Sequence, residues 1–214
     1  MKYERREGKQ LTYYTHRSFD PKVKNHTRVL GIDPSWNSGF AIVEILDRQQ
    51  TQYRLLGFGT VDLRTKILTK NGGADLSTVA KIRRMGFVVD ELVSIFNPRF
   101  AAIETPIIGG SRRGGTFQNV SMIDQGRLYQ HLIDKFWGMY LDDSEVNVMT
   151  AKSAAIAGLA KWKGTPKKDL VLECVKKRFD LNGPFDKATK DYQFAVGDAT
   201  SVALGFIRKH KESI

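Results

Sequence analysis

Short apolar runs that end in turn-forming residues predict the central strands of this chain. Val29–Ile32 is followed by Asp33, and Phe100–Ile103 is followed by Glu104. An apolar run of about four residues closed by turn formers is typical of a buried, central strand in a parallel sheet. We therefore expect both carboxylates at the carboxyl ends of buried strands, at the edge where open α/β sheets bind their ligands.

The remaining pattern predicts two further strands before the first helix and several helices near the carboxyl end. Ser77 has the character of a helix N-cap, apolar residues recur behind it at helical spacing, and Asn97-Pro98 ends that helix. A loop around residues 71–73 precedes it. The expected strands cover residues 29–33, 39–46, 53–61, 100–104 and 146–149, and the other expected helices cover about 117–137, 150–160, 166–179 and 191–210.

This order of elements predicts an α/β fold with a five-stranded mixed sheet flanked by helices. The first three strands form an antiparallel meander, and a right-handed crossover places the Glu104 strand beside the Asp33 strand. The predicted sheet order is 3-2-1-4-5. Two carboxylates ~4 Å apart repel by roughly 4 kcal/mol at an effective dielectric constant near 20, so a proton or a divalent cation is expected between them.

The composition of the chain indicates what kind of partner and compartment to expect. Its 214 residues carry a net charge of +11, which suggests a polyanionic partner, nucleic acid first, although many small basic proteins are merely soluble. We expect a single domain at 28–210 and a basic, aromatic extension at 1–27 that becomes ordered only on a partner. The single cysteine, Cys174, excludes an internal disulfide and fits a cytoplasmic protein, and no apolar run is long enough for a membrane span or a signal peptide.

Several segments of the chain resemble the motifs of a known family. Leu30–Ser35 is similar to the first acidic motif of RuvC-type Holliday junction resolvases, members of the ribonuclease-H-like nuclease superfamily, and Ala102–Glu104 resembles the second. Asp124–Leu128 resembles the Gln-centred helix start that follows, and Gly197–Ala199 resembles the acidic carboxyl-terminal helix. Each motif alone is weak, but their order along residues 28–209 is more specific.

The resemblance implies a ribonuclease-H-like fold and a crossover junction endodeoxyribonuclease that hydrolyses branched DNA. It implies that Asp33, Glu104 and Asp198 are the catalytic residues and the ligands of two metal ions. Oxygen ligands without His or Cys favour Mg²⁺, for which Mn²⁺ can substitute, over zinc. The resemblance further implies a homodimer whose two sites act on opposing strands of a four-way junction.

Five basic residues are candidates for nucleic-acid binding. Lys152, with Lys167 and Lys168, resembles the family's two basic positions near the scissile phosphate. Arg112 and Arg113 lie in a glycine-rich segment beside Glu104, where they either contact DNA phosphates or belong to a solvated loop.

One departure leaves the ligand set open. The family usually carries a second Asp or a His one helical turn before the last Asp, and that position is Ala195 here. Asp191 lies seven residues before Asp198, which is about 10 Å along a helix, and it is typical of a helix N-terminus. Such departures suit a divergent member, for example a viral one, acting in a bacterial cytoplasm or an infected cell.

Two other functions remain as alternatives. A branched-nucleic-acid-binding relative without cleavage fits the missing fourth ligand, while the three retained acids argue against it. An actin-like or sugar-kinase-like ATPase shares a Gly-Ile-Asp strand, but it needs two duplicated domains and a second phosphate loop, which this chain lacks.

Overall fold

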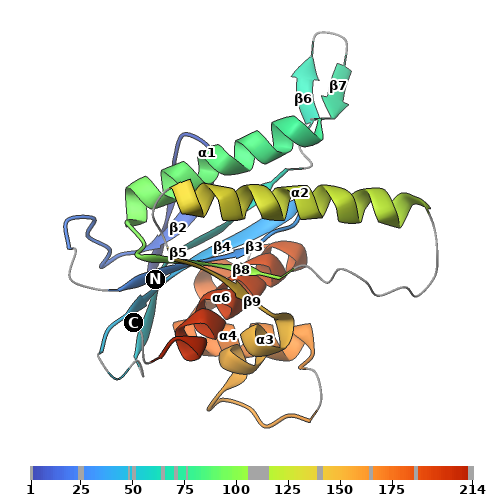
Figure 1. Ribbon diagram of the computed structural model, residues 1–214. Coiled ribbons are helices and arrows are strands. Elements are labelled where there is room, and N and C mark those ends of the chain that lie inside the picture. Colours follow the sequence, from blue (N-terminus) through green and yellow to red (C-terminus); the bar gives the residue numbers. More distant parts are fainter. Residues whose placement is uncertain are drawn as a thin grey trace.

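A computed structural model of the chain describes residues 2–23, 27–47, 49, 52–63, 66–69, 72–75, 77–105, 116–138, 142–163, 166–185 and 188–211. A central β-sheet is covered by helices on both faces, so the molecule has three layers (Figure 1). This arrangement confirms the predicted α/β class.

The central sheet has seven strands in the order β1-β2-β5-β4-β3-β8-β9. Strands β3, β8 and β9 run parallel to one another, and the other neighbours in the sheet are antiparallel. The strands are β1 Tyr3–Glu7, β2 Thr12–His16, β3 Arg28–Asp33, β4 Asn37–Ile45, β5 Tyr53–Asp62, β8 Phe100–Glu104 and β9 Asp142–Val146. The predicted order of five strands is confirmed at the centre, whereas the predicted total of five is wrong because β1 and β2 extend the sheet beyond β5.

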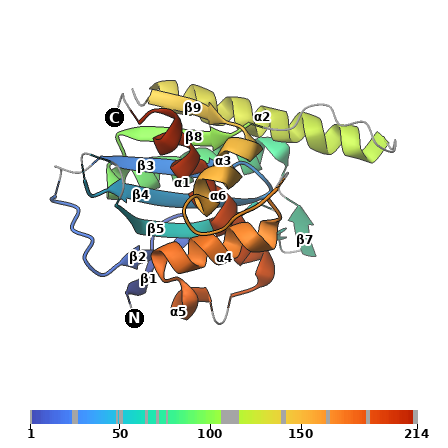
Figure 2. The same ribbon diagram turned by 90° about the horizontal axis from the view of Figure 1, so that it is seen from below.

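Two long helices cover one face of the sheet, and the carboxyl-terminal helices cover the other (Figures 1 and 2). The first pair is α1 Thr78–Phe96 and α2 Thr116–Gly138; the second group is α3 Val148–Ile156, α4 Lys168–Phe179, α5 Asn182–Phe185 and α6 Lys190–Lys209. As predicted, the Ser77 side chain caps α1 by accepting from the Ala80 amide at 3.2 Å, and Asn97 ends it in the left-handed conformation. None of the helices in the described ranges is long and apolar enough to cross a membrane.

Two predicted segments between the main elements are corrected. The strand expected at 146–149 is instead β9, which ends at Val146, because the Asn147 side chain accepts from the Thr150 amide at 2.8 Å and starts α3. The segment expected as a loop around 71–73 contains part of a separate two-stranded hairpin, β6 Lys66–Thr69 and β7 Gly72–Asp75.

The amino-terminal extension is part of the fold. Strands β1 and β2 form a hairpin, and β2 pairs with β5. The Tyr3 hydroxyl donates to the Phe179 carbonyl at 3.0 Å, and the Glu91 carboxylate on α1 accepts from the amides of Lys9 and Gln10 at 2.6 and 2.7 Å. The prediction that these residues become ordered only on a partner is therefore wrong, because Tyr3 and Tyr13 are buried in the hydrophobic core.

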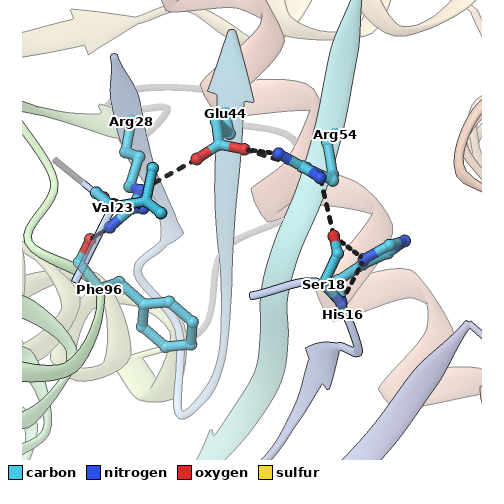
Figure 3. Close-up of polar contacts among 7 residues, drawn as sticks. All are labelled: His16, Ser18, Val23, Arg28, Glu44, Arg54 and Phe96. Atoms are coloured by element: carbon cyan, nitrogen blue, oxygen red, sulfur yellow. Dashed lines mark hydrogen bonds and ion pairs between the residues drawn. The ribbon is translucent and has the colours of Figure 1, made fainter. Parts of the chain in front are cut away.

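A buried ionic network also ties this extension to the sheet (Figure 3). Glu44 on β4 accepts from Arg28 on β3 at 3.1 Å and from Arg54 on β5 at 3.0 Å. Arg54 donates onward to the Ser18 hydroxyl at 2.7 Å. Glu44 is almost completely buried, so its charge is compensated by two guanidinium groups, as a buried carboxylate requires.

Candidate active site

Strand alternation brings Asp33 and Glu104 together. β3 and β8 are parallel neighbours in which Ile32 pairs with Ile103, so the next residue of each strand lies at the same edge of the sheet. Along β3, Leu30 and Ile32 pack in the core under α1 and α2, while Val29 packs in the core under α6. Because side chains alternate between faces, Asp33 and Glu104 project toward the α6 side, and their carboxyl groups form a hydrogen bond.

Two glycines in the sheet let α6 deliver Asp198 to the same place. A Cβ atom on Gly31 would lie 2.3 Å from the Ala199 carbonyl oxygen, and one on Gly39 would lie 1.9 Å from the Ala195 carbonyl oxygen. The backbone of α6 therefore rests directly on β3 and β4. Asp198 is only 9% exposed, and its charge raises the pKa of both other carboxyl groups.

Burial and mutual repulsion make this cluster hold a proton. Burial, followed by the charges of Asp33 and Asp198, raises the pKa of Glu104 to about 8. Burial, followed by the charge of Asp198, raises the pKa of Asp33 to about 6. A protonated Glu104 carboxyl donating to the Asp33 carboxylate is consistent with this order of pKa values, and it relieves the repulsion between two adjacent acids.

Lys168, at the start of α4, compensates the third carboxylate. Its ammonium group donates to Asp198 Oδ2 at 2.8 Å. Burial lowers the pKa of Lys168, but the hydrogen bond to Asp198 and the three carboxylate charges outweigh this effect and raise it. The negative charge of the site is thus compensated by the proton that Asp33 and Glu104 share and by the Lys168 ammonium group.

The carboxyl groups line an open pocket of about 450 Å³. The residues that line this carboxylate pocket are Asp33, Pro34, Ser35, Glu104, Thr105, Gln125, Val148, Lys152, Lys168 and Asp198. The structure therefore brings two of the predicted basic residues, Lys152 and Lys168, to the three acids. Lys167 is the exposed residue just before α4 and does not line the pocket.

Other candidates fall outside the pocket or outside the described residues. Arg112 and Arg113 lie in the range 106–115, which is outside the described part of the chain. Asp191 is exposed in the first turn of α6, and Ala195 is buried against Gly39. Gln125 lines the pocket although the sequence does not single it out as a site residue, and it lies in the interior of α2 rather than at the helix start.

The donor set of the pocket fits a hard divalent cation. Asp33, Glu104 and Asp198 offer carboxylate oxygens, and no His or Cys is among the described residues that line the pocket, which suits Mg²⁺ or Mn²⁺. Among the residues the structure describes, no three acidic, His or Cys side chains converge closely enough to bind one ion as they lie. In this structure the proton on Glu104 and the Lys168 ammonium group balance the negative charge that a metal ion would otherwise balance. Binding an ion therefore requires both to be displaced.

Comparison with known proteins identifies the fold. No family model matches the sequence, and neither does any curated protein. Among solved structures, RuvC from Thermus thermophilus in complex with a Holliday junction substrate has a TM-score of 0.64 at 18% identity, over 87% of this chain and 96% of that chain. Another structure of T. thermophilus RuvC has a TM-score of 0.59 at 18% identity, over 86% and 96% of the two chains.

A mitochondrial protein shares the same architecture. The yeast mitochondrial Holliday junction resolvase Ydc2 has a TM-score of 0.55 at 14% identity, over 85% of this chain and 78% of that chain. These likenesses cover most of each protein. The chain therefore has the fold of RuvC-type Holliday junction resolvases.

Proposed function

We propose that this protein is a metal-dependent endonuclease that hydrolyses phosphodiester bonds of branched DNA, with the four-way junction as its substrate. The observation that carries this proposal is the carboxylate pocket itself. Three acids from two adjacent strand ends and one helix line it together with Lys152 and Lys168, on the fold of junction-resolving nucleases. The net charge of +11 favours a polyanionic substrate.

Each charged side chain of the pocket has a role in this proposal. Asp33, Glu104 and Asp198 would hold the metal, and Glu104 would lose its proton to make room for a cation. Two Mg²⁺ or Mn²⁺ ions, once bound, would activate the attacking water and stabilise the leaving 3′ oxygen. Lys168, freed from Asp198, and Lys152 bind the scissile phosphate and stabilise the negative charge that develops on it.

A homodimer would place two such pockets on one junction. Large apolar side chains on α1 and α2 are exposed, among them Phe87 at 58%, Ile123 at 56% and Trp137 at 71%. These side chains are the ones that we propose for the contact between the two protomers. Sedimentation analysis that gives twice the mass of the chain would support the dimer, and a monomer at micromolar concentration would contradict it.

Branched-DNA binding without cleavage is the second candidate function. It is favoured by Ala195 at the place of a fourth ligand, and by the absence of a convergent ligand set in the described residues. The two functions share a substrate and differ only in the chemical step.

The test compares a labelled four-way junction with a linear duplex of the same sequence, each with Mg²⁺ or with EDTA. We expect symmetric nicks in the junction with Mg²⁺ only, and little cleavage of the duplex. Junction binding without nicks in Mg²⁺ or Mn²⁺ would select the second candidate. Equal cleavage of junction and duplex would contradict selectivity for branched DNA.

A further inference from the structure

A second and larger pocket lies on the same edge of the sheet as the carboxylate pocket. Its volume is about 750 Å³, and its walls come from the β1–β2 hairpin, the end of β5, α1 and the start of α6. Asp62, at the end of β5, lines it and pairs with Asn37, which begins β4 just after the Asp33 turn. The described residues that line the carboxylate pocket and those that line this hairpin pocket do not overlap.

One short contact joins the two pockets. Ser35 lines the carboxylate pocket, and the next residue, Trp36, accepts a hydrogen bond through its carbonyl from the Leu63 amide at 2.8 Å. Leu63 directly follows Asp62, which lines the hairpin pocket. The two pockets are therefore neighbouring parts of one continuous rim at the carboxyl end of the sheet.

Four basic side chains follow this rim, and we call them the rim cations: Lys81, Arg84, Lys9 and Arg5. Lys81 on α1 places its ammonium 5.2 Å from the centre of the Trp36 ring. Arg84, one turn further along α1, lines the hairpin pocket and donates to the Asp62 carbonyl at 3.4 Å. Lys9 and Arg5 line the same pocket from the hairpin.

Positive charge prevails along the rim although two acids also line the hairpin pocket. Glu7 lies 3.7 Å from Arg5, and both side chains are largely exposed, so the pair holds Arg5 only weakly and leaves it able to exchange partners. A third acid, Glu91, accepts from the Lys9 amide beside the pocket. The three acids Glu7, Asp62 and Glu91 do not offset four cations. The rim is therefore suited to a phosphodiester backbone, whose charges repeat along a line.

We propose that the rim cations bind the phosphate backbone of the nucleic-acid arm that leaves the carboxylate pocket. This inference rests on the proposed function. Three strand spacings of about 4.8 Å separate β3 from β2, or ~14 Å in all. Phosphates on one strand of a duplex advance by ~3.4 Å along its axis. The hairpin thus lies about four phosphates from the bond to be cut, and it lengthens the DNA-binding face.

The test compares two triple variants that remove the same charge. The rim variant is Arg5→Ala, Lys9→Ala and Arg84→Ala. The control is Arg6→Ala, Arg83→Ala and Lys177→Ala, whose residues line neither pocket. Arg6 lies next to Arg5 but alternates to the opposite face of β1, and Arg83 is the exposed neighbour of Arg84.

Junction affinity is measured over a salt series without metal, in an Asp33→Asn background that cannot cut. The slope of the logarithm of the association constant against the logarithm of the salt concentration should become shallower by up to about 0.9 for each phosphate that the protein no longer neutralises. We expect a larger change in slope in the rim variant than in the control. A hydroxyl-radical footprint should show weaker protection about four nucleotides from the cleavage point in the rim variant only. Equal slopes and equal footprints would overturn the inference.

Failure of the inference and of the proposed function give different results. If wild-type protein cuts the junction while rim and control variants bind alike, the rim inference fails alone. If wild-type protein never cuts but the rim variant lacks the distal footprint, the nuclease proposal fails and the phosphate-binding rim stands. Thermal unfolding checks that each variant is folded, and single variants at Lys9 and Arg84 repeat the comparison if the triple variant is not.

Discussion

Asp33 and Glu104 make the site sensitive to pH through the proton they share. Their pKa values in the folded chain, about 6 and about 8, lie above the value near 4 expected in an unfolded chain. Between these limits the folded chain binds more protons than the unfolded chain. Without metal, the free energy of unfolding therefore falls as pH rises from about 4 to about 8.

Replacing Glu104 with Gln should remove most of this pH dependence. The amide keeps a donor for Asp33 but cannot ionise, so in EDTA the variant should melt several degrees above wild type at pH 8 and close to it at pH 4. One pKa unit corresponds to ~1.4 kcal/mol, and 1 kcal/mol corresponds to roughly 2–4 °C in a domain of this size. Calorimetry at the two pH values measures the difference; an equal shift at both would contradict the proton-sharing arrangement.

At this scale most of the pocket can be predicted from the sequence. Asp33 and Glu104 are predictable because each follows an apolar run, and the alternation of side chains along a strand fixes the face of the sheet on which each lies. Asp198 is predictable because small residues surround it. Lys167 and Lys168 cannot be separated from sequence, since only the start of α4 decides which of them reaches the pocket. Gln125 carries a signal in its motif, but no periodicity in the sequence places that part of α2 over the acids.

At the scale of the element, the approach of α6 to the sheet assembles the site. The helix is buried from Ala195 to Ile207, and it touches β3 and β4 at Gly31 and Gly39. Any side chain at these two positions would displace the helix, and with it Asp198, from the strand ends.

Gly39→Ala tests this dependence. Its Cβ would lie 1.9 Å from the Ala195 carbonyl oxygen, so we expect a destabilisation of at least ~1–3 kcal/mol from overpacking and a loss of metal-dependent activity. The matched control is Gly126→Ala in α2, where nothing lies within 4 Å of the added atom and a gain of about 1 kcal/mol is expected. Urea unfolding measures both, and an unchanged stability for Gly39→Ala would contradict the close packing.

Elements that depend on distant contacts are the ones that the sequence pattern does not predict. The hairpin of β1 and β2 contains few buried residues, and its place is set by pairing with β5 and by Glu91 of α1. No hydrophobic periodicity within residues 1–27 predicts either contact. The end of β9 is hard to place because Val146 and Val148 look alike in sequence, whereas Asn147 between them caps a helix.

At the scale of the whole molecule, both pockets and the rim cations lie along one edge of the sheet. The carboxylate pocket and the hairpin pocket adjoin there, and the rim cations follow the same edge. The net charge of +11 favours a polyanionic partner. In the proposed function, the acids at the centre of this edge would hold the metal ions used to cleave the phosphodiester bond.

The number of carboxylate ligands in the pocket should determine the metal concentration that cleavage needs. α6 contributes Asp198 to the pocket, whereas Ala195 carries no ligand and Asp191 lies exposed outside it. We therefore expect cleavage to need millimolar Mg²⁺ and to be restored at lower concentrations of Mn²⁺, which binds oxygen sites more tightly. Titrating each ion in a junction-cleavage assay measures this requirement. Saturation by micromolar Mg²⁺ would indicate a ligand that the pocket does not include.

The central claim is that Asp33, Glu104 and Asp198 bind the catalytic metal and cut branched DNA. Its most direct test is single-turnover cleavage of a labelled four-way junction in Mg²⁺ by wild type, Asp33→Asn and the control Asp191→Ala. We predict that Asp33→Asn abolishes cleavage but binds the junction as well or more tightly, since one negative charge facing phosphate is removed, and that Asp191→Ala cuts like wild type. Cleavage by Asp33→Asn at a rate near that of wild type would contradict the account.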